Sequence, residues 1–437
     1  VLTKVAVTVY AGGLVFQQVF GIKELWGIDF FWIAAIGLVV LTALYTIFGG
    51  MKSVLYTSVL QTPILLLGSL IILVLGFKEL GGWNEMMRVC GAVTVNDYGD
   101  TMTNLIRSND DANFPWLGAL IGSAIIGFWY WCTDQFIVQR VLSGKNEMEA
   151  RRGTIFGAYL KLLPVFLFLI PGMIAFALHQ KYIGAGGEGF LPMLANGTAN
   201  ADAAFPTLVA KLLPAGVKGL VVCGILAALM SSLASLFNSS AMLFTIDFYK
   251  RFRPETPEKK LVGIGQVATV VIVILGILWI PIMRSVGDVL YTYLQDVQSV
   301  LAPGIAAAFL LGICWKRTSA QGGMWGLIAG MVIGLTRLGA KVYYSNAGEV
   351  ADSTFKYLFY DMNWLFFCGW MFLFCIIVVI VVSLATKAPT AEEIQGLVFG
   401  TATKEQKAAT RASWNHWDII HTVIILAITG AFYWYFW

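Results

Sequence analysis

Eleven long apolar stretches occupy about half of this 437-residue sequence. Each has roughly the 20 residues that a helix needs to cross the ~30 Å apolar layer of a bilayer. The alternation of polar and apolar residues that a transmembrane strand needs is absent. The stretches run Val5–Ile22, Phe30–Ile47, Val54–Phe77, Trp116–Trp131, Tyr159–Leu178, Gly219–Phe244, Leu261–Met283, Val289–Trp315, Gly323–Leu338, Trp364–Ala385 and Ile419–Trp437. The sequence therefore predicts an all-α polytopic protein surrounded by the lipid bilayer.

The composition supports this prediction and excludes several classes of protein. Hydrophobic residues make up 58% of the chain and charged residues only 12%, whereas a soluble domain has about 25% charged residues. The net charge of +4 is too small to indicate a nucleic-acid partner. The sequence contains neither a P-loop nor an H-E-x-x-H motif. We therefore expect no nucleic-acid binding and no enzymatic activity.

The distribution of Lys and Arg predicts the orientation in the membrane, because cytoplasmic loops are enriched in these residues. One set of short loops contains only Lys23, Arg284, Lys341 and Lys356. The opposite set contains Lys52, Lys145, Arg151, Arg152, Lys250, Arg251, Arg253, Lys259, Lys260, Lys316, Arg317, Lys387, Lys404, Lys407 and Arg411. We expect the second set to be cytoplasmic and the C-terminus to be extracellular or periplasmic. The membrane would be a plasma membrane or a bacterial inner membrane.

Polar residues at membrane depth are candidates for function, because burying them in lipid is costly. Lys161 follows the start of its apolar stretch by two residues, in GAYLKLLPVF. It either extends its ammonium group to the interface or donates to a ligand in a wet cavity. Trp129, Tyr130 and Trp131 run directly into Cys132-Thr133-Asp134. These aromatic residues form either an interfacial belt or a stacking platform for the apolar face of a ring.

Two other stretches combine oxygen-bearing groups with helical spacing. Ala228, Ser231 and Ser232 lie at i, i+3 and i+4 in a segment rich in small residues. Such a segment favours close helix packing, or it presents a carbonyl and two hydroxyls to Na⁺ if another helix supplies further ligands. Gln295, Asp296 and Gln298 precede Pro303-Gly304. There we expect a break in the helix whose freed backbone groups either line a cavity or are buried in protein.

Five segments resemble the sodium/solute symporter family, and in particular its sodium–glucose cotransporter branch. They are LTALYTIFGGMKSVLYT, FWYWCTDQFIVQRVLSGKN, GAYLKLLP, LAALMSSLASLFNSSAMLFTIDFYK and APGIAAAFLLGICWKRTSAQGGMWGL. The resemblance implies a LeuT-type core of two inverted five-helix repeats with additional C-terminal helices. Residues 1–77 would be the last three core helices of the first repeat and 78–115 an extracellular loop. Residues 116–315 would be the second repeat and 316–437 three peripheral helices, so we expect the first two core helices to lie upstream of Val1.

The resemblance also assigns roles to individual residues. Ala228, Ser231 and Ser232 match the family's Na⁺ ligands. Other positions match residues that contact the sugar or close the path to it, namely Lys161, Gln295, Tyr130 with Trp131 beside it, and Tyr291 at the outer gate. The implied function is Na⁺-coupled secondary active symport of a glucose- or galactose-like monosaccharide by alternating access.

Three positions depart from the family pattern. Gly127 replaces a polar residue that contacts the sugar, and Gln298 stands where Thr is usual. Ser58 replaces an Asp that helps to hold a second sodium, which predicts coupling to a single Na⁺. Symport of myo-inositol or of a sugar acid remains open, as does a sugar sensor that does not accumulate its ligand. The sequence assigns neither the particular sugar nor the oligomeric state.

Overall fold

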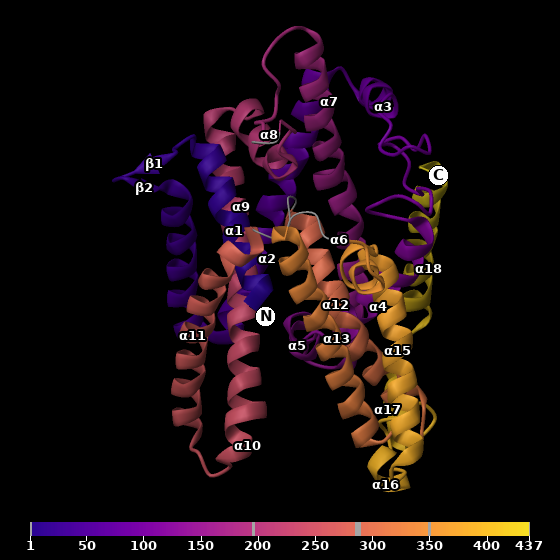
Figure 1. Ribbon diagram of the computed structural model, residues 1–437. Coiled ribbons are helices and arrows are strands. Elements are labelled where there is room, and N and C mark those ends of the chain that lie inside the picture. The colour runs from indigo at the N-terminus through magenta and orange to yellow at the C-terminus, as the bar shows by residue number, and fades with distance from the viewer. Residues whose placement is uncertain (1, 195–196, 285–289, 348–350, 437) are drawn as a thin grey trace. The chain divides into compact units, whose positions relative to one another are not determined.

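A computed structural model describes residues 2–194, 197–284, 290–347 and 351–436, and most of them are helical (Figure 1). The predicted span that starts at Val289 and the one that ends at Trp437 thus each have an end outside the described residues. The chain divides into two compact units. Of the described residues, unit 1 comprises 2–103, 160–194, 197–284 and 290, and unit 2 comprises 104–159, 291–347 and 351–436.

Unit 1 is a helical bundle with one short hairpin. Its elements are α1 (Leu2–Phe20), β1 (Glu24–Leu25), β2 (Ile28–Asp29), α2 (Phe30–Leu80), α3 (Trp83–Gly91), the π-helix η1 (Val165–Leu169), α7 (Ile170–Gly184), the 3-10 helix η2 (Ala201–Ala203), α8 (Ala204–Leu212), α9 (Ala215–Met242), the π-helix η3 (Leu243–Tyr249), α10 (Lys250–Phe252) and α11 (Glu258–Arg284). The hairpin turns at Trp26 and Gly27, both with positive φ, and it is a small addition to the predicted all-α fold.

The second and third apolar stretches follow each other without a non-helical loop between them. Residues 48–53 stay helical, so Phe30–Leu80 forms one run of 51 residues. The run is not one straight rod, because Gly12 of α1 lies against both Leu38 of α2 and Leu229 of α9. Leu229 is close along α9 to Ser231, which contacts Ser58 of α2, so α2 doubles back between Leu38 and Ser58. Lys52 was expected in a loop, but the helical assignment continues through Gly49, Gly50 and Lys52 although glycine lowers helix propensity.

The antiparallel packing of α2 on α9 forms the centre of unit 1. Glycine allows the two backbones to approach, because a Cβ on Gly68 would lie 2.7 Å from Val221. A Cβ on Gly224 would likewise lie 3.2 Å from Ile64. Around this pair, α2, α3, α7, α8 and α9 bury one apolar core that includes Ile72, Ile174, Leu178, Leu208 and Val221. The predicted Na⁺ residues of α9 therefore belong to a closely packed pair of helices.

Unit 2 contains the remaining helices. They are α4 (Trp116–Cys132), α5 (Gln135–Leu142), most of α6 (Glu147–Pro164), α12 (Leu290–Cys314), α13 (Ala320–Asn346), α14 (Thr354–Lys356), the π-helix η4 (Tyr357–Asp361), α15 (Trp364–Ala385), α16 (Ala391–Ile394), α17 (Lys404–Ala412) and α18 (His416–Tyr435). Helix α13 extends beyond the predicted end at Leu338 by two turns. This extension moves Arg337 from the end of a helix into its interior.

Small residues also bring the helices of unit 2 close together. The Cα of Gly304 on α12 lies opposite Gly330 on α13, where a Cβ on Gly330 would approach it to 2.9 Å. Gly122 of α4 faces the backbone of Leu365 on α15 in the same way, because a Cβ on Gly122 would lie 2.8 Å from the Leu365 carbonyl oxygen. The predicted break at Pro303-Gly304 is wrong, because α12 runs through both residues and buries them.

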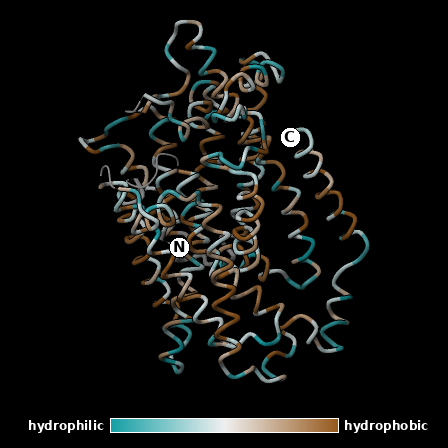
Figure 2. The backbone as a smooth tube through the Cα atoms, turned by 45° about the vertical axis from the view of Figure 1, so that its right-hand side comes forward, coloured by the Kyte–Doolittle hydropathy of each residue, from teal (hydrophilic) through white to brown (hydrophobic). Residues whose placement is uncertain are grey.

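The hydropathy of the helices agrees with a multi-pass membrane protein. Figure 2 shows hydrophobic residues along the long helices and hydrophilic residues mainly in the connecting segments. Among the described residues, eight helices are long and apolar enough to cross a bilayer, or nine if α4 and α5 are one broken span. The structure therefore does not confirm the count of eleven spans.

Candidate functional site

The three residues predicted to bind Na⁺ lie on α9 in unit 1. At about 100° per residue, Ala228, Ser231 and Ser232 occupy one face of the helix that is roughly 100° wide. Ser231 is buried, whereas Ala228 and Ser232 are half-buried. Within the described part of the chain, the Ser232 hydroxyl forms no hydrogen bond. The face therefore presents at least one hydroxyl oxygen that a cation can use.

Ser58 of α2 lies directly against this face. Its hydroxyl oxygen is 2.6 Å from that of Ser231, and either oxygen can be the donor. When Ser231 donates to Ser58, both lone pairs of the Ser231 oxygen stay free to face a cation. The sequence placed Ser58 at a second sodium position only through the family resemblance, and it gave no sign of this contact. The contact joins residues 173 positions apart, so no local pattern could have indicated it.

The alternative of close packing applies to Ser231 as well, because this buried residue contacts Ser58 of α2. Ser235 is fully buried and its hydroxyl donates to the Ser231 carbonyl oxygen at 3.0 Å. Gly224 and Val221 make the contacts with α2 that were described above. Ser231 thus takes part in the packing of α9 on α2, and the Na⁺-binding role of Ala228, Ser231 and Ser232 stays a prediction.

The aromatic residues of α4 belong to unit 2 and differ in their environments. Trp129 is buried in a cluster with Ile125 and Ile126, and Tyr130 packs against that cluster. Trp131 is 50% exposed and meets the Tyr130 ring edge to face, with 5.2 Å between ring centroids. A side chain added at Gly127 would meet nothing within 4 Å, so this position faces open space.

Helix α4 ends in a bend of 46° to α5. Asp134 stabilises the start of α5, because its carboxylate accepts a hydrogen bond from the backbone N–H of Phe136 at 3.2 Å. The Thr133 hydroxyl donates to the Trp129 carbonyl oxygen at 2.8 Å. The polar residues after the aromatic run thus form a helix junction, and Tyr130 lies within one turn of it.

Helix α12 contributes two predicted sugar residues that contact each other. The side-chain amide of Gln295 donates to the Tyr291 hydroxyl at 3.0 Å. Gln298 is buried and lies about 60° from Gln295 around the helix. One turn further, Ala302 on the same face belongs to the apolar cluster that contains Trp129 of α4. This face of α12 therefore leads towards the aromatic residues of α4.

Lys161 lies in the part of α6 that belongs to unit 1, and its side chain is exposed. The helical run Glu147–Gly184 has 38 residues, about 57 Å, so it exceeds the ~30 Å apolar layer. Its first turns are polar, and Lys161 lies where they give way to the apolar part. This position agrees with the interfacial alternative and with the ligand-binding one, and the role of Lys161 stays a prediction.

Unit 2 contains a cluster of charged residues that was not predicted from the sequence. Asp296 of α12 forms ion pairs with Arg337 and Lys341 of α13. The two basic residues are spaced i, i+4 in TRLGAK, which could have indicated one charged helix face. The predicted span ended at Leu338, whereas α13 continues to Asn346 and includes both basic residues.

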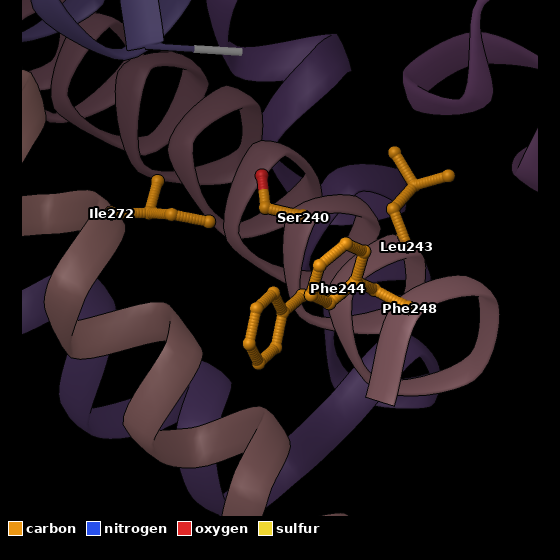
Figure 3. A pocket seen from close by; sticks show the side chains of 5 residues that line it. All are labelled: Ser240, Leu243, Phe244, Phe248 and Ile272. Atoms are coloured by element: carbon orange, nitrogen blue, oxygen red, sulfur yellow. The ribbon is translucent and has the colours of Figure 1, made fainter. Parts of the chain in front are cut away.

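A pocket of about 350 Å³ lies elsewhere in unit 1 (Figure 3). It is lined by Leu243, Phe244 and Phe248 of η3, Ser240 of α9 and Ile272 of α11. The Ser240 hydroxyl donates to the Leu236 carbonyl oxygen at 2.6 Å, so the lining offers a sugar almost no free polar group. None of the predicted site residues lines this pocket.

Comparisons with known proteins agree along nearly the whole chain. A family model described as the sodium:solute symporter family matches residues 1–330. The sodium/mannose cotransporter SLC5A10 of Bos taurus is 35% identical over 100% of this chain and 75% of its own length. The human sodium/myo-inositol cotransporter 2 is also 35% identical, over 92% of this chain and 60% of its own length. The sodium/glucose cotransporter 1 of Ovis aries is 36% identical over 89% of this chain and 60% of its own length.

A solved structure supports the predicted fold. It is described as the substrate-bound outward-open state of a Na⁺-coupled sialic acid symporter that reveals a novel Na⁺ site. The TM-score is 0.64 at 20% sequence identity, and the match covers 89% of this chain and 75% of that chain. The likeness confirms the LeuT-type fold. The division of the chain into repeats at residues 77, 115 and 315 stays a prediction.

Proposed function

This chain belongs to the sodium:solute symporter family, and from this premise we propose that it transports a monosaccharide together with Na⁺. The family consists of transporters, which agrees with the prediction that the chain is not an enzyme, and its coupling ion is Na⁺. The chain spans 75% of one curated relative and 60% of two others. The names of these relatives give mannose, myo-inositol and glucose as substrates, so myo-inositol is the second candidate.

The contact between Ser58 and Ser231 is the observation that carries the proposal. It places two hydroxyl oxygens 2.6 Å apart on facing helices, next to the half-buried Ser232. Hydroxyl and carbonyl oxygens are suitable ligands for a hard monovalent cation within a helical membrane protein. We propose that Na⁺ binds here as a transported substrate, with the Ala228 carbonyl and the Ser231 and Ser232 hydroxyls as ligands.

Unit 2 supplies most of the residues proposed to bind the sugar. Gln295 and Gln298 provide amide groups that can donate to and accept from sugar hydroxyls. Tyr130 provides an aromatic face on which the C–H side of a sugar ring can stack, and Trp131 supports it at the ring edge. The open space at Gly127 leaves room for water or for a larger substituent on the sugar. Tyr291 is proposed to close the path from the outside to the sugar while it accepts the hydrogen bond from Gln295.

The proposed transport cycle uses both ligands. Na⁺ binding favours the outward-open state, the sugar binds next, and the protein then opens inward by alternating access. In the proposed orientation the loops rich in Lys and Arg are cytoplasmic and the C-terminus is outside. A plasma membrane or a bacterial inner membrane fits this arrangement.

The decisive experiment is uptake of labelled glucose, mannose and myo-inositol into proteoliposomes with and without an inward Na⁺ gradient. We expect accumulation only with the gradient. Uptake that does not depend on Na⁺ would contradict symport, and binding without uptake would favour the sugar sensor. A sugar acid as the preferred substrate would give Lys161 a direct role in binding.

Serine variants test the proposed Na⁺ residues. Ser232→Ala should raise the Na⁺ concentration for half-maximal uptake about tenfold or more, because a ligand to a charged group contributes about 1.5–3 kcal/mol. Ser231→Ala should also raise the Na⁺ concentration for half-maximal uptake. Ser240→Ala is the matched control, since Ser240 lies on the same helix and its hydroxyl bonds only to Leu236. An unchanged Na⁺ dependence in Ser232→Ala would exclude this site.

A further inference from the structure

A buried cluster of charged residues holds α12 against α13 within unit 2. The Asp296 carboxylate accepts a hydrogen bond from Lys341 Nζ, and its other oxygen lies 3.6 Å from a guanidinium nitrogen of Arg337. The Asp296 side chain is 12% exposed and that of Arg337 only 1%. Arg337 is thus among the largest fully buried side chains of the described residues.

Arg337 extends the cluster to two further segments of unit 2. It donates to the carbonyl oxygens of Met362 and Leu358, at 2.7 and 3.4 Å. Its guanidinium carbon lies 4.1 Å from the centre of the Phe367 ring on α15. One arginine therefore connects α12 and α13 to η4 and to the start of α15.

The cluster contains two basic groups and one carboxylate. Burying charges costs more free energy than a single ion pair returns, so such a cluster is a poor way to stabilise a fold. Its partners are far apart in sequence and bind in one geometry. Buried ion pairs of this kind fix the register and the rotation of helices in some proteins. The cluster is therefore better suited to orienting α12 than to increasing stability.

Helical geometry relates this orientation to the proposed sugar residues. Around α12, Asp296 points about 100° from Gln295 and about 160° from Gln298, because each residue turns the helix by about 100°. The two glutamines themselves are about 60° apart. Helix α12 thus carries its charged anchor on the side of α13 and its sugar-binding amides on the other side. A rotation of one residue would move both glutamines off that face.

We infer that Asp296, Arg337 and Lys341 are positioning residues that set the rotation of α12 and thereby direct Gln295 and Gln298 towards the sugar. This inference rests on the proposed function, because it assigns a purpose to the orientation of the glutamines. The cluster acts through α12 and does not itself contact the sugar.

Transport kinetics give the first test, with the natural protein in proteoliposomes. Asp296→Asn keeps the shape of the side chain but leaves two basic groups unpaired, and Lys341→Gln leaves Asp296 paired with Arg337. We expect Asp296→Asn to raise the KM for sugar about tenfold and Lys341→Gln to raise it about threefold. The maximal rate per molecule and the Na⁺ dependence should change much less. The double variant, which pairs two neutral amides, should have a lower KM than Asp296→Asn alone.

The matched control is Asp352→Asn. Asp352 forms an ion pair of 2.8 Å with Lys356, four residues further along the chain. In contrast to Asp296, the Asp352 side chain is 94% exposed. We expect no change in KM there. Unchanged KM values in both Asp296→Asn and Lys341→Gln would overturn the inference. A loss of uptake that only follows the amount of folded protein would overturn it too, because that result shows a purely structural role.

Thiol labelling tests the orientation without any sugar. Gln295→Cys is treated with a water-soluble maleimide, and the modified peptide is quantified by mass spectrometry. We expect the labelling rate of Cys at this position to change at least threefold when Asp296→Asn is added, and to stay the same with Asp352→Asn. An unaffected rate contradicts the inference even if Asp296→Asn folds normally. If the natural protein shows no Na⁺-driven uptake, the proposed function fails while this measurement still decides the role of the cluster.

Discussion

Cys90 illustrates how the surroundings of one residue set its chemistry. It lies on α3, outside the membrane-spanning helices, with a side chain that is fully buried. Its thiol points at the Met173 carbonyl oxygen, 3.7 Å away. Burial raises the pKa of the Cys90 thiol to about 11, because the thiolate is desolvated. The neutral thiol is thus favoured in the folded protein. The free energy of unfolding therefore decreases as the pH rises from the pKa of a free thiol, about 8.5, to the raised pKa of about 11.

We therefore expect Cys90 to react slowly with N-ethylmaleimide in the folded protein. At pH 7.5 only about one thiol in 3,000 would be ionised, and the thiolate is the reactive form. The labelling rate should rise about tenfold per pH unit up to about pH 10. Peptide mass spectrometry of protein labelled from pH 7 to 10 measures this slope, and protein unfolded in urea provides the control. A rate that levels off below pH 9 would contradict the burial of this thiol.

Single residues also show which parts of the site were predictable. Ala228, Ser231, Ser232 and Gln295 could be proposed because oxygen-bearing residues stand out within an apolar helix and repeat at helical spacing. Ser58 and Arg337 owe their importance to partners on other helices, Ser231 and Asp296. Such contacts depend on tertiary packing, which a local pattern does not contain.

At the scale of helices, close approach depends on positions where no side chain is present. The Gly304–Gly330 contact brings the backbones of α12 and α13 together. A methyl group at position 330 would lie 2.9 Å from the Gly304 Cα, so the backbones would have to separate. Gly339 lies on the same helix, but a Cβ there would meet nothing within 4 Å.

We expect Gly330→Ala to destabilise the protein by about 1–3 kcal/mol, the usual cost of overpacking. Gly339→Ala is the control, and it should be neutral or stabilising by up to ~1 kcal/mol because alanine favours the helix. Thermal unfolding in detergent, followed by tryptophan fluorescence, measures both. Equal midpoints for the two variants would show that the contact between α12 and α13 tolerates a methyl group.

The helices themselves were mostly predictable, since a helix within lipid must be apolar over about 20 residues. The residues at which the helices begin and end were harder to predict. The helical run through Lys52 and the extension of α13 past Leu338 both continue across polar residues. The helical hydrogen bonds of such residues form whether or not their side chains are apolar, so hydropathy alone places these ends too early.

At the scale of the whole molecule, family membership and the proposed single Na⁺ site together set a limit on accumulation. One Na⁺ crossing 100 mV supplies about 2.3 kcal/mol, and a tenfold Na⁺ gradient adds about 1.4 kcal/mol. Together they support a sugar accumulation of roughly 500-fold, whereas two Na⁺ ions per sugar would support roughly the square of that ratio. Ser58 replaces the Asp that is expected where a second Na⁺ binds, and its hydroxyl is instead bonded to Ser231.

We therefore expect proteoliposomes held at −100 mV, with a tenfold inward Na⁺ gradient, to accumulate sugar no more than about 500-fold. The ratio of charge moved to sugar moved, measured on the same vesicles, should be one, and it does not depend on leakage. A ratio of two would show that a second Na⁺ binds without a carboxylate at position 58.

The variant Ser58→Asp tests the second Na⁺ site directly. A carboxylate beside Ser231 should raise the ratio of charge to sugar if position 58 and the Ala228/Ser231/Ser232 site bind Na⁺ independently. An unchanged ratio in that variant would place the second site of two-sodium relatives elsewhere in the fold.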